Sequence, residues 1–211
     1  MSFWLILRLN MKHLLTFIGR YFVNLVAFVD CCFSWRLGLE YEYEKRGKIE
    51  KALNKQIELE ASSSQYYLAM ASWTESQGLT GTAEFLYQHS DEEREHMLKL
   101  VKFINERGGT SVIPGLSKPP TTFNSLASVF ESLLEHELNV TDSINNVVDL
   151  CLSEKDYTTH NFMQWYVSEQ LEEEALARTI LDKLNMIGND KAGLYMFDRD
   201  LSLMANQESS Q

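Results

Sequence analysis

Glu93 and His96 stand three residues apart, and a carboxylate and an imidazole at that spacing could bind one metal ion. On a helix the two side chains project from the same face, about one turn apart. That face also carries Leu86, His89 and Leu100, so the pair lies on a mainly apolar stripe that faces inward. A buried carboxylate is costly unless it is paired or holds a cation. The alternative is a chance pair of charges on a Glu-rich helix.

Three other helix-length segments repeat this pattern. Each carries apolar or aromatic residues at steps of three and four, with an acidic residue near its middle: Glu60, Glu137 and Glu173. In a bundle of helices of similar length the midpoints meet at one level, so we expect four carboxylates and one imidazole to converge. Four negative charges in a dry core repel one another, and a pair of cations between them would remove that repulsion.

The expected ligands are rich in oxygen and include one nitrogen. Such a set suits iron, and manganese and zinc are also compatible with it. Tyr67 lies two turns from Glu60 on the same stripe. It is either a core aromatic residue whose hydroxyl binds a neighbour, or a redox-active or hydrogen-bonding neighbour of the metals. The three cysteines have neither a zinc-binding spacing nor a disulfide framework, and Cys151 reads as a buried free thiol.

The elements that position these residues are long helices. Uninterrupted periodic segments predict helices over 48–77, 82–107, 125–151 and 158–186, and a short one over 191–204. All three prolines fall between residues 114 and 120, which predicts an extended connection between the second and third helices. Short connections join the first helix to the second and the third helix to the fourth, so the helices of each pair are expected to be antiparallel. The predicted fold is therefore all-α, a four-helix bundle with one long crossover and a short fifth C-terminal helix.

Charge separates the chain into two parts. The net charge is -11, and residues 1–43 contribute +1 of it (four basic and three acidic residues), which leaves -12 for the remainder. This acidity argues against a nucleic-acid partner and is compatible with attracting cations. Within 1–43 the longest run without a charged residue is 21–29, which is too short to span a membrane. The segment is a mis-set translation start, a membrane-associating or partner-binding arm, or a cleaved targeting segment. Membrane contact is expected only if this extension is real.

From about Gly47 to Gln207 the chain resembles the bacterial non-haem ferritins. The resemblance runs through LNKQIELEASSSQYY, EFLYQHSDEEREHM, LLEHEL, NFMQWYVSEQLEEE and GLYMFDRDLS. It implies that residues 44–211 form a ferritin-like di-iron domain. It also implies a cytoplasmic shell of twenty-four identical subunits, which oxidises Fe(II) with dioxygen or peroxide and stores ferric mineral. Iron is then the only expected metal, and identical copies of the subunit are the expected protein partners.

The resemblance also assigns roles to single residues. It implies one iron held by Glu60, Glu93 and His96. The second iron is held by Glu93, Glu137 and Glu173, with Gln170 beside it, so that Glu93 bridges the pair. A third iron would use Glu92, Glu169 and Glu172, of which Glu92 and Glu172 would otherwise be plain solvated charges. Tyr67 falls on the family's tyrosine beside the centre.

Four related classes fit the sequence less well. Bacterioferritins carry a second Glu-x-x-His, where this chain has Gln170 and Glu173, and nothing supports haem. A DNA-protecting mini-ferritin would lack the fifth helix and would hold its metals between subunits. A non-catalytic shell would lack the ligand set. A di-iron oxygenase or peroxidase on the same bundle would be expected to carry the second histidine.

Overall fold

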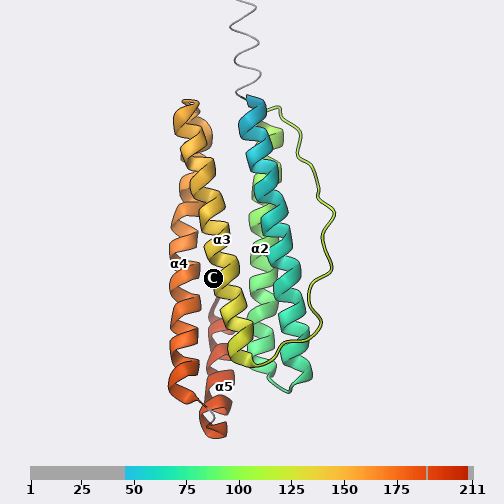
Figure 1. Cartoon of the computed structure of the whole chain (residues 1–211), viewed down its shortest axis with the longest axis vertical. Coiled ribbons are helices and arrows are strands. Elements are labelled where there is room, and N and C mark those ends of the chain that lie inside the picture. Colours follow the sequence, from blue (N-terminus) through green and yellow to red (C-terminus); the bar gives the residue numbers. More distant parts are fainter. Residues whose placement is uncertain (1–45, 189, 209–211) are drawn as a thin grey trace, which may run out of the picture. The chain divides into compact units, whose positions relative to one another are not determined.

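The fold is a bundle of long helices with a shorter helix at one end (Figure 1). A computed structural model describes residues 46–188 and 190–208, with side chains described as far as Ala205. The predicted extension, residues 1–43, lies outside them. Lys48–Gln211 form one compact unit. The described part of the first helix covers residues 46–76, and it is followed by α2 (Thr80–Glu106), α3 (Leu126–Ser153), α4 (Tyr157–Ile187) and α5 (Lys191–Glu208). The predicted all-α bundle is confirmed.

The connections set the direction of each helix. The first helix and α2 are antiparallel and joined by a tight turn in which Gly78 adopts a left-handed conformation (φ 82°). The proline-containing crossover then runs along the outside of the bundle to its other end, so α2 and α3 point the same way (Figure 1). α4 returns antiparallel to α3. This topology brings the middle of all four long helices to one level.

Local capping explains where α3 and α4 begin. Ser125 and Ser128 form a reciprocal capping box at the start of α3. Asp156 caps α4 by accepting a hydrogen bond from the Thr159 N–H at 3.1 Å. Arg107, just after α2, donates to both carboxylate oxygens of Asp156 at 2.8 and 2.7 Å. The end of α2 is thereby tied to the start of α4.

α2 begins earlier than the sequence pattern predicts, because its cap comes from another helix. The predicted helix begins at residue 82, yet Thr80 and Gly81 also belong to α2. Leu79 offers no capping side chain. Instead Asp198 of α5 accepts from the backbone N–H groups of Gly81 at 3.2 Å and Thr82 at 2.8 Å. A Cβ on Gly81 would overlap the backbone carbonyl of Asp198, so the glycine allows α5 to approach this closely.

Two apolar clusters lie above and below a polar layer in the middle of the bundle. Buried aromatic side chains such as Phe85 and Phe130 belong to the cluster that α5 covers. The other cluster includes Ile57, Leu100 and the buried free thiol of Cys151. On each long helix the central glutamate falls between residues of the two clusters, so the acids lie in a band that apolar side chains enclose. Within the described ranges, no helix combines the length and apolar character needed to cross a bilayer.

Candidate metal centre

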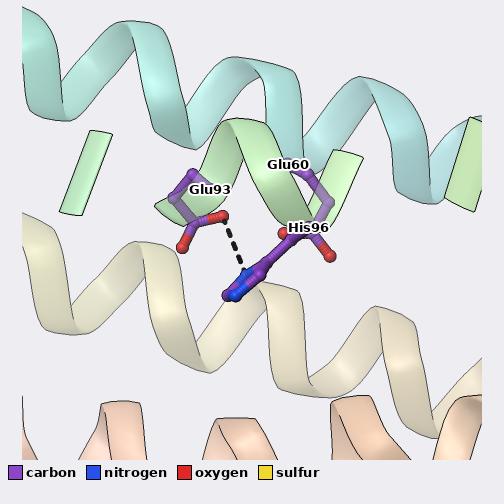
Figure 2. Close-up of side chains that lie close together, drawn as sticks. All are labelled: Glu60, Glu93 and His96. Atoms are coloured by element: carbon purple, nitrogen blue, oxygen red, sulfur yellow. Dashed lines mark ion pairs between the residues drawn. The ribbon is translucent and has the colours of Figure 1, made fainter. Parts of the chain in front are cut away.

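Glu60, Glu93 and His96 meet in the middle of the bundle. Glu60 comes from the first helix and the other two from α2 (Figure 2). Each offers one ligand atom, and these three atoms all lie within 4.8 Å of one another. The three residues are only 1%, 3% and 7% exposed. A carboxylate pair and an imidazole brought this close inside a core form a potential cation site.

The surroundings of His96 keep it neutral and fix its ring. Burial lowers the pKa of His96 to about 4, so the imidazole carries no charge at neutral pH and has a lone pair for a cation. Its Nδ1 lies 3.9 Å from Glu93 Oε2 (Figure 2). The ring packs edge-on against Trp165 with centroids 5.1 Å apart, and the Lys99 ammonium lies 3.4 Å from the centre of the Trp165 ring.

Glu137 of α3 is held by two donors. The Tyr67 hydroxyl donates to its Oε1 at 2.5 Å, and the Gln170 amide donates to its Oε2 at 3.1 Å. Burial, followed by the charge of Glu173, raises the pKa of Glu137 to about 7 even though both hydrogen bonds favour ionisation. The structure therefore gives Tyr67 and Gln170 a definite contact: both orient the same carboxylate.

Glu173 of α4 differs from the other central acids because an imidazole faces it. Its Oε2 lies 3.3 Å from His89 Nε2. Burial opposes its ionisation, but the attraction of His89 outweighs burial and lowers the pKa of Glu173. Burial likewise disfavours a charged His89, yet the negative charge of Glu173 prevails and raises the pKa of His89 to about 9. In the metal-free protein this pair is an ion pair.

Gln56 is a site residue that the sequence analysis did not single out. Its side chain is fully buried, and its amide nitrogen donates to Glu60 Oε1 at 2.9 Å. This bond fixes the orientation of the carboxylate. Gln56 lies four residues before Glu60, so a search for polar residues one turn from each central acid would have found it.

Burial raises the pKa values of two of the central acids, and the charges of neighbouring carboxylates add to the effect on one of them. Burial raises the pKa of Glu60. It raises the pKa of Glu93 well above its ordinary value, and the charges of Glu60 and Glu137 add to the effect. A proton is the simplest cation that relieves such crowding, and divalent metal ions bound between the acids would relieve it further. The arrangement is thus chemically suited to exchange protons for metal ions.

The predicted third position is more open. Glu172 is exposed, and Glu169 is partly buried with a pKa raised by burial and then by the charges of Glu173 and Glu172. Glu92 is also partly exposed, and its Oε2 lies 3.3 Å from His89 Nδ1. The grouping of Glu92 with Glu169 and Glu172 stays a prediction.

These features define a class of protein: helical bundles that hold carboxylates and an imidazole together in a buried centre. Comparison with known families identifies it further: residues 50–187 match the ferritin-like domain of the Ferritin family. The chain belongs to this family, as its sequence resemblance predicted.

Individual relatives agree with this assignment. A probable bacterial non-heme ferritin-like protein of Haemophilus influenzae is 45% identical over 159 residues, which cover 75% of this chain and 96% of the relative. A bacterial non-heme ferritin of Campylobacter jejuni is 43% identical over 158 residues, covering 75% and 95%. Among solved structures, an open pore ferritin of the archaeon Archaeoglobus fulgidus superimposes with a TM-score of 0.73 at 44% identity, covering 74% of this chain and 95% of that chain.

Proposed function

We propose that this chain is an iron-storage ferritin that oxidises Fe(II) at a dinuclear centre within each subunit. The observation that carries the proposal is the group of buried ligand atoms of Glu60, Glu93 and His96, all within 4.8 Å of one another. Family membership and the names of the relatives, bacterial non-heme ferritins, support iron as the metal. Iron is the substrate and the stored product here rather than a permanent cofactor.

Two iron positions follow from the ligands. Glu60, Glu93 and His96 hold the first Fe(II). Glu137 and Glu173 hold the second together with Glu93, which bridges the two ions. Because only the first position includes a neutral imidazole, the second ion is bound by carboxylates alone and exchanges more readily. That difference suits a centre that passes its product onward.

The supporting residues act on the ligands rather than on the metals. Gln56 orients Glu60, while Tyr67 and Gln170 orient Glu137 through their hydrogen bonds. These contacts keep the carboxylates in place before iron arrives, so less ordering is needed on binding.

The redox step balances with dioxygen as the oxidant. Each of the two Fe(II) ions gives one electron, and dioxygen takes both electrons and two protons to become hydrogen peroxide. Two electrons delivered together avoid the release of superoxide. The two Fe(III) ions then bind hydroxide or oxide from water, leave the carboxylates and enter the mineral. Peroxide, as an alternative oxidant, would take two electrons and two protons to give two molecules of water.

We also propose that the subunits assemble into a hollow shell of twenty-four copies. Several large apolar side chains are exposed on the isolated subunit, among them Ile113 (67%) on the crossover, Leu171 (74%) and Met186 (79%) on α4, and Tyr195 (71%) on α5. Apolar and aromatic side chains of this kind are typical of subunit interfaces. The likeness to ferritin structures supports the same assembly.

An Fe(II) oxidation assay tests the catalytic proposal. Anaerobic protein is mixed with two Fe(II) per subunit and then with oxygenated buffer, and ferric absorbance and oxygen consumption are recorded. The parent is expected to consume about one dioxygen per two Fe(II) in the first phase. Glu93→Gln is expected to slow this phase at least tenfold, because it removes a ligand from both ions. Glu95→Gln, a change at an exposed α2 residue two positions away, is the matched control.

Two outcomes would overturn parts of the proposal. A Glu93→Gln protein that oxidises Fe(II) as fast as Glu95→Gln would disprove the dinuclear assignment. Size-exclusion chromatography of the parent tests the shell separately: elution as a monomer or small oligomer would exclude storage in a cavity, whatever the oxidation rate.

A further inference from the structure

A chain of polar side chains leads from Glu137 of the proposed centre to the surface between α3 and α4. The Gln170 amide nitrogen donates to Glu137 Oε2 at 3.1 Å and to the Thr141 hydroxyl oxygen at 3.3 Å. The Thr141 hydroxyl in turn donates to Glu174 Oε1 at 2.7 Å. Glu174 ends the chain in an ion pair with Arg178, one turn further along α4. Thr141 and Glu174 have no place in the proposed ligand set.

The direction of each hydrogen bond in this chain is fixed from its outer end. A carboxylate paired with a guanidinium carries no proton, so Glu174 can only accept, and it takes the single proton of the Thr141 hydroxyl. The Thr141 oxygen then has only lone pairs left, so Gln170 must present its amide nitrogen rather than its carbonyl oxygen. The same nitrogen lies 3.2 Å from the backbone carbonyl oxygen of Glu137, a third acceptor.

The depth of these residues makes the orientation of the amide important. Glu137 is fully buried and Gln170 is 4% exposed, whereas the side chains of Glu174 and Arg178 are 15% and 53% exposed. An amide buried at the level of the centre has little water to compensate for a wrong orientation, so a mismatch with the Glu137 carboxylate is costly. The outer residues therefore determine which end of a buried amide faces the centre.

We propose that Thr141 and Glu174 are positioning residues, which hold Gln170 so that its amide nitrogen keeps the Glu137 carboxylate in one orientation for the second metal position. This role rests on the proposed function, in which Glu137 and Glu173 bind the second iron. A Thr141 hydroxyl released from Glu174 can donate to the amide oxygen, and Gln170 can then turn that oxygen toward Glu137. Two acceptors facing each other repel, so the carboxylate loses its fixed orientation and the second position binds metal more weakly.

Substitutions at two positions separate the hydrogen bonds of the chain from the shape of its side chains. Thr141→Val keeps the branched shape and removes the hydroxyl, whereas Thr141→Ser keeps the hydroxyl and removes a methyl group. Glu174→Ala removes the acceptor at the outer end and leaves Thr141 intact. Two changes at exposed α4 residues are the matched controls: Thr179→Val removes a hydroxyl outside the chain, and Asp182→Ala removes a carboxylate outside it.

Diffraction from crystals of the full-length protein soaked in limiting Zn(II) measures the effect. The readout is the ratio of two anomalous peak heights at the zinc edge, the peak at Glu137 divided by the peak at His96. The first position serves as an internal reference, because a general loss of folding or of zinc lowers both peaks. A supporting residue of this kind contributes about tenfold in metal affinity, so the ratio should fall severalfold in Thr141→Val and in Glu174→Ala. The serine variant and the two controls should keep the ratio of the parent.

Fe(II) oxidation kinetics give a second measurement. Weaker binding at the second position should raise KM for Fe(II) severalfold in Thr141→Val and leave kcat close to that of the parent, because saturating iron still fills both positions. A folded Thr141→Val protein, checked by circular dichroism, whose zinc ratio matches the parent would overturn the proposal. So would a serine variant that behaves like the valine variant, since the methyl group rather than the hydroxyl would then be what matters.

The zinc ratio and the oxidation assay distinguish this role from the proposed function. If the parent does not oxidise Fe(II) while the zinc ratio falls in Thr141→Val and not in Thr141→Ser, the proposed function is wrong and the positioning role stands. If the parent oxidises Fe(II) while the ratio is the same in all variants, the positioning role alone is wrong. A parent crystal with no zinc at Glu137 and Glu173 would overturn both the second position and the role of Thr141.

Discussion

Replacing Glu137 with Gln should make the metal-free protein less sensitive to rising pH. The pKa of Glu137 is raised from 4.5 to about 7, first by burial and then by the charge of Glu173. Because the pKa is higher in the folded than in the unfolded chain, the residue's contribution to stability is complete below about pH 4.5 and is lost as the pH rises through 7. A shift of this size corresponds to about 3 kcal/mol of unfolding free energy.

The variant removes this titration but introduces a constant cost. Gln can still accept from the Tyr67 hydroxyl, but its amide nitrogen faces the Gln170 amide, a mismatch worth about 1 kcal/mol. That cost does not change with pH. We therefore expect the stability difference between Glu137→Gln and the parent to shift by about 3 kcal/mol in favour of the variant between pH 4.5 and pH 8. Removing the charge also lessens the repulsion on Glu93, which acts in the same direction.

Urea unfolding of chelator-treated protein, followed by circular dichroism at both pH values, measures this shift. Glu131→Gln, an exposed change on α3, is the control and should show no shift relative to the parent. All proteins must elute as the same oligomer before unfolding. A shift below about 1 kcal/mol would refute the reasoning, since Glu137 would then be ionised in the folded protein at low pH despite its burial. Added Zn(II) should reverse the ranking by stabilising the parent more than the variant.

Three further changes test how the fold and the centre are supported. Gly81→Ala forces a Cβ into the backbone carbonyl of Asp198 and should cost about 1–3 kcal/mol, seen as a lower Tm. Asp198→Ala removes the cap of α2 and should cost about 1–2 kcal/mol, whereas Asp200→Ala, at an exposed α5 residue, should leave Tm unchanged. Gln56→Leu removes the hydrogen bond to Glu60 and should weaken the first Zn(II) binding step in calorimetry at least severalfold, with the Fe(II) oxidation rate falling in parallel.

The helices and their central acids are predictable because their signals are local. Apolar residues spaced three and four apart indicate which face of a helix points into the core. Glu60 and Glu137 lie on such faces, so the sequence alone identifies them as inward-facing acids. The position of the prolines predicts the long crossover. The crossover makes a bundle in which the midpoints of the four long helices lie at one level. The capping box at Ser125 is a local signal as well.

Contacts between distant segments are what the sequence does not reveal. The early start of α2 depends on Asp198, more than a hundred residues away, because α5 folds back over the end of the bundle. The sequence pattern places His89 on the inner face but gives it no partner. Its meeting with Glu173 of α4 follows from the rotation of each helix about its own axis, and a stripe several residues wide does not define that rotation. Gln56 was overlooked for a different reason, since its signal is local but weak.

The charge arrangement of the centre explains how its acids can lie close together in the absence of metal. Glu60, Glu93 and Glu137 all have raised pKa values, whereas that of Glu173 is lowered because His89 faces it. The metal-free core thus reduces its negative charge in two ways, by retained protons on one side and by an imidazolium on the other. Two divalent ions at the dinuclear centre would displace those protons. Proton release should therefore begin when metal binds, before any electron moves, and metal affinity should fall as the pH drops below 7.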